Sequence, residues 1–291
     1  MRIPPYNVGM PELPEVETVA RGVDRRVRGD RIVEAWFSRY PQPFKTPASR
    51  QARGLEGRFL LHIHRTGKHI VCELGRETPA AGKLSAADAD AQWIVHLGMT
   101  GRLVVTVPEA PVAAHTHARL RLDSGRELRF VDPRRFGRLE WRDLARSARF
   151  AAAGEEPLTI GREAFAALFR GRKLAIKAAL LNQSLLTGVG NIYADESLFH
   201  AGIRPVRKAG RLSAAELERL RTALQKVLQA AIRLGGSSIS NYVDAEGVRG
   251  FFQLEHCVYQ RDGEPCRVCK EPIRRMVLAG RGTHYCPQCQ R

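Results

Sequence analysis

Residues 10–17 are Met-Pro-Glu-Leu-Pro-Glu-Val-Glu, with two prolines and three glutamates within residues 11–17. An apolar repeat with helical spacing follows it, at Val16, Val19, Val23 and Val27. Proline suits the first turn of a helix, and glutamates there complement the helix dipole. The pattern therefore predicts a helix start, which is its more common meaning.

The same stretch has a second interpretation, which depends on where translation begins. If it begins at Met10 and the methionine is removed, Pro11 becomes an N-terminal secondary amine. Such an amine is a nucleophile toward sugar aldehydes, and the neighbouring glutamates could move protons for it. The stretch alone favours the helix start, and the other motifs of the chain determine whether Pro11 is also a candidate nucleophile.

The composition points to a polyanionic partner. The chain has 291 residues, with 47 Lys and Arg against 30 Asp and Glu, for a net charge of +17. An excess of this size most often indicates nucleic acid, although a generally basic enzyme is the alternative. No apolar run approaches the ~18 residues that span a membrane, and residues 1–9 lack the apolar core of a signal peptide. We expect a monomer in the bacterial cytoplasm, associated with the nucleoid and not with a membrane.

The chain changes character near its middle, which predicts an α+β protein of two domains. β-type runs occupy residues 31–37, 59–63, 69–74, 93–97, 103–107, 118–122 and 127–131. Helical patterns occupy residues 162–170, 173–183, 191–200 and 213–234, before a Cys-rich end. The expected divisions are nine extra residues at 1–9, a β domain at 10–145, a helical domain at 146–256 and a zinc module at 257–291.

Four cysteines near the C-terminus have the spacing of a metal site. Cys266 and Cys269 form one Cys-x-x-Cys pair, and Cys286 and Cys289 form a second one after sixteen intervening residues. Four thiolates complete the tetrahedral shell of structural zinc and leave no position open for catalysis. Cys72, within a strand pattern, is expected to be a buried small hydrophobe. The role of Cys257 stays open.

Three turns carry residues suited to nucleic acid. Arg281 lies near the tip of an expected hairpin over 274–285, where an arginine suits a phosphate or is simply solvated. Residues 188–191, Gly-Val-Gly-Asn, form either a phosphate site at a helix start or an ordinary turn between helices. In residues 132–137, Asp-Pro-Arg-Arg-Phe-Gly, Arg134 could read a base edge while Phe136 enters the stack. Met99, between two glycines, could be a second such wedge; the alternative is that Met99 and Phe136 are core residues.

Taken together, these motifs resemble the formamidopyrimidine-DNA glycosylase family. The matching segments are PELPEVE at 11–17, HLGMTGRL at 96–103, DPRRFG at 132–137, GVGNIYADE at 188–196 and GRGTHYC at 280–286 with the paired cysteines. They occur in the family's order from residue 10 to the C-terminus. PELPEVE also favours this branch over the related endonuclease VIII type, which opens with PEGPE.

The resemblance implies a fold, a partner and a reaction. The fold would be an N-terminal β-sandwich with a flanking helix, followed by a helix-two-turn-helix domain with a zinc-finger β-hairpin that holds one structural zinc ion. The partner would be double-stranded DNA containing oxidised bases. The enzyme would flip out an oxidised purine, such as 8-oxoguanine or a formamidopyrimidine, remove it, and cut the strand by β- and δ-elimination as an AP lyase.

The resemblance also assigns roles to individual residues. Pro11 would attack the sugar and form an iminium, Glu12 would be the general acid/base, and Glu15 would support the site. Lys68 would donate a proton in β-elimination, and Arg281 would grip a phosphate for δ-elimination. The DNA-binding set comprises His115 and Lys173 at the backbone, Lys177 and Asn191 at a phosphate, and Met99, Arg134 and Phe136 in the vacated stack. Residues 242–252 would close over the flipped base.

Two departures from the family pattern leave alternatives open. Asn182 stands where the family usually has Asp, which removes one charge. Residues 1–9, if retained, would make Pro11 an internal imide without a basic nitrogen. The chain would then be a non-catalytic, zinc-containing relative that binds damaged DNA. A glycosylase for oxidised pyrimidines, of the endonuclease VIII type, is the third reading.

Overall fold

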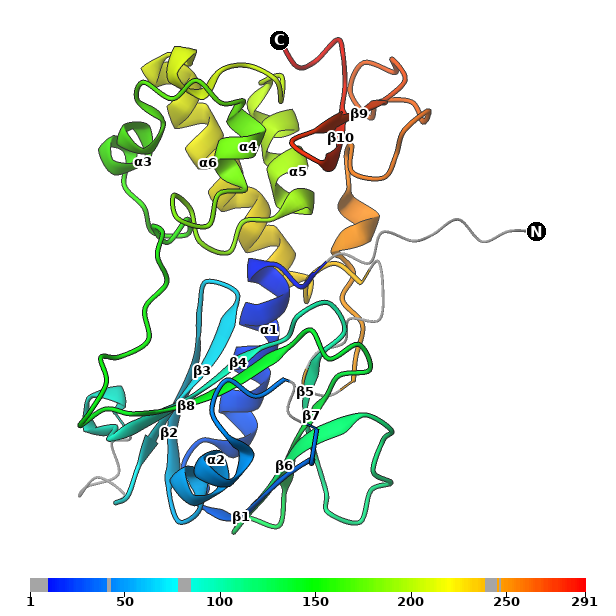
Figure 1. Cartoon of the computed structure of the whole chain (residues 1–291). Coiled ribbons are helices and arrows are strands. Elements are labelled where there is room, and N and C mark those ends of the chain that lie inside the picture. The colour runs from blue at the N-terminus through cyan, green and yellow to red at the C-terminus, as the bar shows by residue number, and fades with distance from the viewer. Residues whose placement is uncertain (1–9, 41–42, 78–84, 239–244, 246) are drawn as a thin grey trace. The chain divides into compact units, whose positions relative to one another are not determined.

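The computed structural model describes residues 10–40, 43–77, 85–238, 245 and 247–291 (Figure 1). These residues form two compact units. The first unit runs through Ala151 and also takes in Ser237–Gly250. The second consists of Ala152–Gly236 and Phe251–Arg291.

The first unit contains two four-stranded antiparallel sheets (Figure 1). One sheet has the order β1-β6-β7-β5 and the other has the order β2-β3-β4-β8. The strands are β1 (Ile32–Phe37), β2 (Phe59–Thr66), β3 (His69–Gly75), β4 (Ala91–His96), β5 (Arg102–Thr106), β6 (Thr116–Leu122), β7 (Glu127–Val131) and β8 (Arg138–Asp143). The expected hairpin at 118–131 is formed by β6 and β7, which pair directly.

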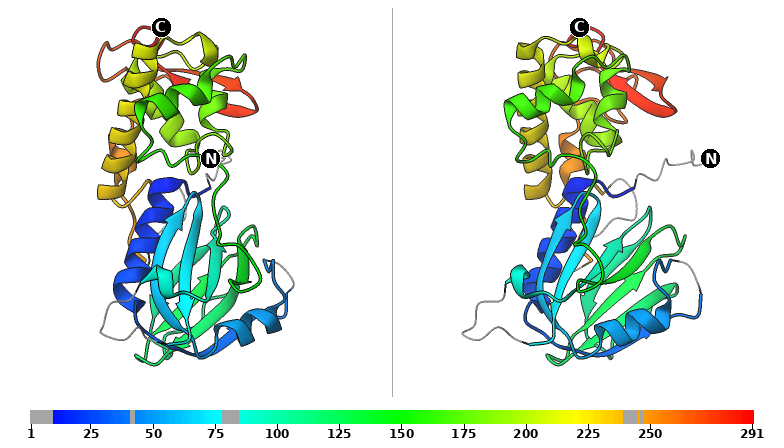
Figure 2. Two further views of the ribbon diagram at one scale, coloured as in Figure 1. Left: turned by 90° about the vertical axis from the view of Figure 1, so that its left-hand side faces the viewer. Right: turned by 60° about the vertical axis from the view of Figure 1, so that its left-hand side comes forward.

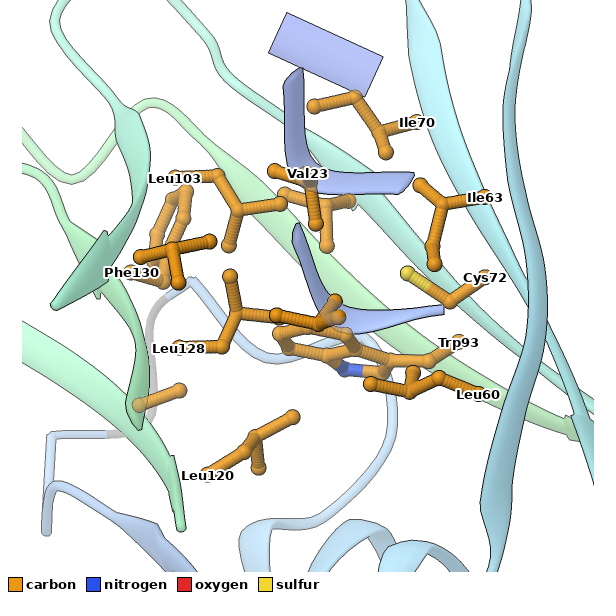
Figure 3. Close-up of a cluster of buried hydrophobic side chains, with 14 of the residues drawn as sticks. Val23, Leu60, Ile63, Ile70, Cys72, Trp93, Leu103, Leu120, Leu128 and Phe130 are labelled. Atoms are coloured by element: carbon orange, nitrogen blue, oxygen red, sulfur yellow. The ribbon is translucent and has the colours of Figure 1, made fainter. Parts of the chain in front are cut away.

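Helix α1 (Leu13–Val27) shares one hydrophobic core with both sheets. It contacts β2 and β3 of one sheet and β5 of the other. Figure 3 shows Val23 between Leu103 and Phe130 on one side and Ile63 and Cys72 on the other. Each of these side chains is at most 2% exposed, and burial of one such aliphatic side chain contributes about 1.5–3 kcal/mol. The expected β-sandwich with a flanking helix is therefore confirmed, as is the burial of Cys72.

The second unit is built from helices and one hairpin. Its helices are α3 (Arg162–Phe169), α4 (Ile176–Leu180), α5 (Asn191–Ala201) and α6 (Ala214–Arg233). Helices α5 and α6 pack against each other, and strand β10 (Arg281–Tyr285), paired with β9 (Arg274–Leu278), packs on α5 (Figure 2). Helix α6 begins with the expected capping box, in which Glu216 N donates to Ser213 Oγ and Ser213 N donates to the Glu216 carboxylate.

The helix expected over 173–183 is much shorter in the structure. Residues before Ile176 run alongside the segment 207–210 instead, because Ile176 N donates to Arg207 O and Ala209 N donates to Leu174 O. These tertiary hydrogen bonds override the helix propensity of the local sequence. Lys173 therefore lies on a loop before α4 and not on the helix.

One α-helix and one strand of the first unit were not expected from the sequence. Helix α2 (Ala48–Leu55) is short, and β8 is an edge strand with charged residues at alternate positions. Gly54 of α2 packs so closely on Trp141 of β8 that a Cβ there would lie 2.3 Å from the indole ring. Neither element has the long apolar repeat on which a prediction depends.

Residues 237–250 belong to a different unit from the one expected. The expected helical domain ran through residue 256, but Ser237–Gly250 packs with the first unit. Ala245 is 1% exposed within the first unit's core, and Val105 N of the edge strand β5 donates to its carbonyl. Ala245 also fits against Gly22 of α1, where a Cβ would lie 3.0 Å from the Ala245 methyl group. Of the expected base-closing loop at 242–252, residues 242–244 and 246 lie outside the described residues.

Candidate functional site

The N-terminus of α1 is fixed by the carboxylate of Glu15. Glu12 is the N-cap residue, and its N–H donates to Glu15 Oε2 at 2.9 Å. Ser237, 222 residues further on, donates its N–H to Glu15 Oε1 at 2.7 Å. Pro11 and Glu12 are buried at this helix start. Both Glu15 oxygens thus accept backbone N–H groups, so Glu15 fixes the backbone of Glu12 and that of Ser237.

Lys68 lies in the two-residue turn between β2 and β3. Gly67 adopts the left-handed conformation, with φ of 61°, which lets the chain reverse within two residues. Arg65 donates to Gly67 O at 3.1 Å and to Glu17 of α1 at 2.8 Å. The lysine turn is therefore braced against the same helix that carries Glu12.

A buried aspartate joins the two turns that carry the expected stacking residues. Asp132 is 0% exposed; its Oδ2 accepts the Gly137 N–H at 2.7 Å, and its Oδ1 accepts the Thr100 hydroxyl at 2.6 Å. The first turn contains Met99 and the second contains Arg134 and Phe136. The two backbones touch, since a Cβ on Gly98 would lie 2.5 Å from Gly137 N. The two turns therefore form one continuous surface.

The side chains on this surface differ in their exposure to solvent. Phe136 is 47% exposed, and the Arg134 guanidinium lies over its ring, 4.7 Å from the ring centroid. Met99 is half-buried. His115 is exposed, and its carbonyl accepts the Asp132 N–H. The alternative in which Phe136 is a core residue is therefore wrong.

His96 stabilises the turn that contains Met99 through a hydrogen bond to its backbone. Burial, with the nearby His69 and Lys68, lowers the pKa of His96 to about 4. The ring is then neutral at pH 7, and its Nδ1 accepts the Gly98 N–H at 3.1 Å. The charge of Lys68 thus helps to keep this acceptor unprotonated.

In the second unit, Lys177 does not lie on a surface. Its side chain is 0% exposed, and its ammonium contacts Asp195 Oδ1 at 2.7 Å, Thr283 Oγ1 at 2.8 Å and Gly282 O at 2.9 Å. An ammonium has three donors, so these contacts use its whole capacity. The expected direct phosphate contact by Lys177 does not fit this geometry, because Asp195, 18 residues away, draws the charge inward. Lys177 instead fixes the hairpin of the zinc module.

Arg281 lies at the tip of the β9–β10 hairpin. The turn is made by Ala279 and Gly280, both with positive φ, and the Arg281 side chain is exposed. The next residue, Gly282, accepts from Lys177 and from Asn191 Nδ2, the latter at 3.0 Å. The exposed guanidinium is thus carried by a backbone that two side chains hold in place.

Two other expected positions of this unit lie at turns. Lys173 is exposed on the loop before α4. Asn191 begins α5 directly after Gly190, whose missing side chain leaves the positive end of the helix dipole uncovered by a capping group. Asn182 accepts the Ser184 N–H at 3.0 Å, a turn contact that an aspartate would make equally well.

The four paired cysteines fit a zinc ion. Their sulfur atoms all lie within 4.8 Å of one another, with 3.9 Å between Cys266 and Cys289 and 3.4 Å between Cys269 and Cys286. A tetrahedron with Zn–S bonds of about 2.3 Å has edges of roughly 3.8 Å, which agrees with these separations. The N–H groups of Val268 and Cys289 point at two of the sulfurs, as thiolates require. The expected single structural zinc site is therefore confirmed.

Comparison with known families accounts for three successive parts of the chain. Residues 10–139 match the formamidopyrimidine-DNA glycosylase N-terminal domain, residues 154–243 match the H2TH domain of the same enzymes, and residues 263–291 match a zinc finger found in FPG and IleRS. A formamidopyrimidine-DNA glycosylase of Solibacter usitatus is 45% identical over 282 residues, covering 97% of this chain and 100% of the relative. The chain belongs to the formamidopyrimidine-DNA glycosylase family.

Other members of the family agree in sequence and in fold. The Cupriavidus pinatubonensis glycosylase is 43% identical over 297 residues. The Lactococcus lactis Fpg in complex with DNA containing an abasic site has a TM-score of 0.83 at 34% identity, over 96% of this chain and 99% of that one. The Thermus thermophilus MutM (Fpg) structure has a TM-score of 0.80 at 39% identity, over 96% and 98%. None of the helices in the described ranges has the length and apolar character of a membrane span.

Two residues that organise this glycosylase site received no role from the sequence. Asp132 begins the motif at 132–137, but the motif suggested no role for it. An aspartate before a proline commonly accepts backbone N–H groups in a turn, which was a usable signal. Asp195 lies one helical turn after Asn191, so both side chains lie on the face of α5 that meets the hairpin. Because Asn191 was already a candidate, this spacing could have indicated a role for Asp195. Asp195 also accepts the His284 N–H at 2.9 Å, which fixes β10 a second time.

Proposed function

We propose that this protein removes oxidised purines from duplex DNA and then cuts the strand, with Pro11 as nucleophile and Glu12 as proton carrier. The observation that carries the proposal is the helix start. Glu15 holds the backbone of Glu12 at a fixed position, and Pro11 directly precedes it. A glycosylase that is also a lyase needs an amine and a proton carrier at one place.

The chemistry follows from a free amine at Pro11. An α-amino group has a reference pKa of about 8, so part of it is neutral at pH 7. Its lone pair would bond to the sugar C1′ while the bond to the damaged base breaks, and the base would leave with that electron pair and take up a proton. The product would be an aminal that still carries the ring oxygen O4′. Loss of the proton on the proline nitrogen and cleavage of the C1′–O4′ bond, with a proton delivered to O4′, would open the sugar to an iminium. The iminium would make the C2′ protons acidic, so that loss of one expels the 3′ phosphate, and a second elimination expels the 5′ phosphate. Glu12 and Lys68 would carry these protons.

The DNA contacts are proposed in two groups. Met99, Arg134 and Phe136 would fill the space left by the flipped base, with the guanidinium facing the unpaired partner. Arg281, Asn191, Lys173 and His115 would contact phosphates. Lys177 would act indirectly, through the hairpin that carries Arg281, because its ammonium is already enclosed.

The cellular setting is part of the same proposal. We expect a monomer in the bacterial cytoplasm, where the net charge of +17 would keep it on chromosomal DNA. The zinc ion would hold the hairpin and take no part in the chemistry, since four thiolates fill its coordination shell.

Borohydride trapping on a duplex with 8-oxoguanine opposite cytosine tests the proposal. Protein that begins at Pro11 after processing from Met10 should give a covalent complex, since borohydride reduces the iminium to a stable amine. The matched control is the chain with residues 1–9 retained, in which the same proline nitrogen is an imide. N-terminal sequencing of the cellular protein then shows which form exists.

The outcomes separate the possible functions. Equal trapping by both forms would place the nucleophile elsewhere, and no trapping by the Pro11 form would remove the proposed reaction. Glu12→Gln should lower base removal strongly, whereas Glu34→Gln, at an exposed position of β1, should not. Faster excision of thymine glycol than of 8-oxoguanine would contradict the oxidised-purine specificity.

A further inference from the structure

A second group of metal-ligand side chains lies in the second unit, apart from the four zinc cysteines. Glu196 and His200 stand one turn apart on the same face of α5, and Cys257 comes from the segment that leads to the zinc module. One ligand atom from each lies within 4.8 Å of the other two. No role in DNA binding or in the proposed reaction uses any of them.

The separations suit a metal ion. Cys257 Sγ and His200 Nε2 are 3.8 Å apart. A tetrahedral zinc ion with a sulfur at about 2.3 Å and a nitrogen at about 2.05 Å places those two atoms roughly 3.6 Å apart. A weak S–H···N contact would also allow the observed distance, so the third donor and the surroundings matter.

The third donor, Glu196, is held rigidly. Its Oε2 accepts the Cys257 N–H at 2.8 Å, and its Oε1 accepts the N–H groups of Val258 and Tyr259 at 2.9 and 2.8 Å. A carboxylate offers about four acceptor positions, so one remains for an ion. Hydrogen-bonded carboxylates are the usual form of such ligands in proteins, because the bonds fix their orientation.

The group is reachable from solvent. Glu196 is 1% exposed, but His200 is exposed and Cys257 is half-buried. His200 and Cys257 also line a pocket of about 820 Å³ within the second unit, together with Glu255 and Arg267.

We propose that Glu196, His200 and Cys257 form a second binding site for a thiophilic divalent metal such as Zn²⁺, with its fourth position open to this pocket. One thiolate, one imidazole and one carboxylate form a donor set that zinc accepts, and three protein ligands leave room for water. The bound ion would link α5 to residues 256–259, at the entry to the zinc module. This site is independent of the reaction proposed above.

Metal stoichiometry on the full chain tests the proposal. Zinc-loaded protein is titrated with Co²⁺ and its absorption is recorded, and zinc content per chain is measured after equilibration with Zn²⁺ and gel filtration. The wild type should bind a second equivalent with a single-thiolate charge-transfer band. His200→Ala and Cys257→Ser should each lose that equivalent and keep the first. Cys72→Ala and Glu255→Gln, which leave the three donors in place, should keep both.

Two results would overturn the inference. One is a wild type that stays at one equivalent under these conditions, which would mean that the sulfur and imidazole make only a weak hydrogen bond. The other is a second equivalent that survives in both His200→Ala and Cys257→Ser, which would place the ion elsewhere. Because the His200 side chain is exposed, its removal should not impair folding, and the test stands even if Cys257→Ser folds poorly.

Discussion

Replacing Asp132 by asparagine is expected to destabilise the first unit and to weaken recognition of damaged DNA. The carboxylate is fully buried and accepts the Gly137 N–H at 2.7 Å and the Thr100 hydroxyl at 2.6 Å. Its two oxygens also accept two backbone N–H groups, those of Arg134 and Gly137. Asparagine keeps one acceptor oxygen but turns an NH₂ group toward one of these two N–H groups, which can only donate. The loss of a charge-assisted hydrogen bond with a donor left unpaired costs about 2–4 kcal/mol.

Two measurements separate the effects of this substitution. Thermal unfolding should show the first unit melting roughly 10 °C lower, because 1 kcal/mol shifts Tm by about 2–4 °C in a domain of this size. Binding to a duplex with 8-oxoguanine should weaken more than binding to undamaged duplex, since only the former needs Met99, Arg134 and Phe136 in place.

Asp88→Asn is the matched control for Asp132→Asn. Asp88 is an exposed carboxylate of the same unit, and its substitution should change neither quantity. If Asp132→Asn lowered Tm but reduced affinity for both duplexes equally, the two turns would not act as one preformed surface. If neither quantity changed, the hydrogen bonds of Asp132 would not hold the turns at all.

Three further predictions follow from other parts of the molecule. Arg281→Ala should reduce by about 1 the slope of log affinity against log salt, because one phosphate contact is lost. The exposed Arg274→Ala on the neighbouring strand should not, and equal slopes in the two variants would contradict the assignment. Removal of zinc by a chelator should unfold the hairpin and abolish duplex binding while the Tm of the first unit is unchanged; retained affinity would refute a structural role for the ion. Finally, the folded-state pKa of His96, about 4, lies below its ordinary 6.5, so the unfolded chain binds more protons between these values. The free energy of unfolding should therefore fall as the pH is lowered from 6.5 to 4. His96→Asn, whose side-chain oxygen can accept the same Gly98 N–H, should flatten that pH curve, and an unchanged curve would show that this histidine does not titrate as stated.

The sequence predicted most of the regular elements, because those elements carry strong periodic signals. Helix α6 has an apolar stripe and a capping box, and β6 and β7 alternate around a turn. The helix expected over 173–183 failed for a physical reason. Its first residues pair with the segment 207–210, and no local pattern reports a partner so far along the chain.

The roles of the candidate site residues stay predictions, but the structure shows how far each side chain is buried. The exposed positions Arg134, Phe136 and Arg281 have the surroundings that their motifs suggested. Lys177 is buried, which its motif did not suggest, because its ammonium contacts Asp195 and the carbonyl of Gly282 at a hairpin tip 105 residues away. From the sequence, a lysine in a basic motif is expected to face DNA. The buried groups that accept from the Lys177 ammonium come from distant parts of the chain, and only the fold brings them together.

The segment Ser237–Gly250 has a consequence for the order in which the chain can fold during synthesis. The sandwich is first on the ribosome, yet Ala245, which closes its core over Gly22, is translated only after α3 to α6. Until then the Val105 N–H lacks its native acceptor and Glu15 lacks the N–H of Ser237. The nascent first unit therefore lacks these contacts until residues 237–250 have been synthesised. A fragment ending at Ala151 would never form them.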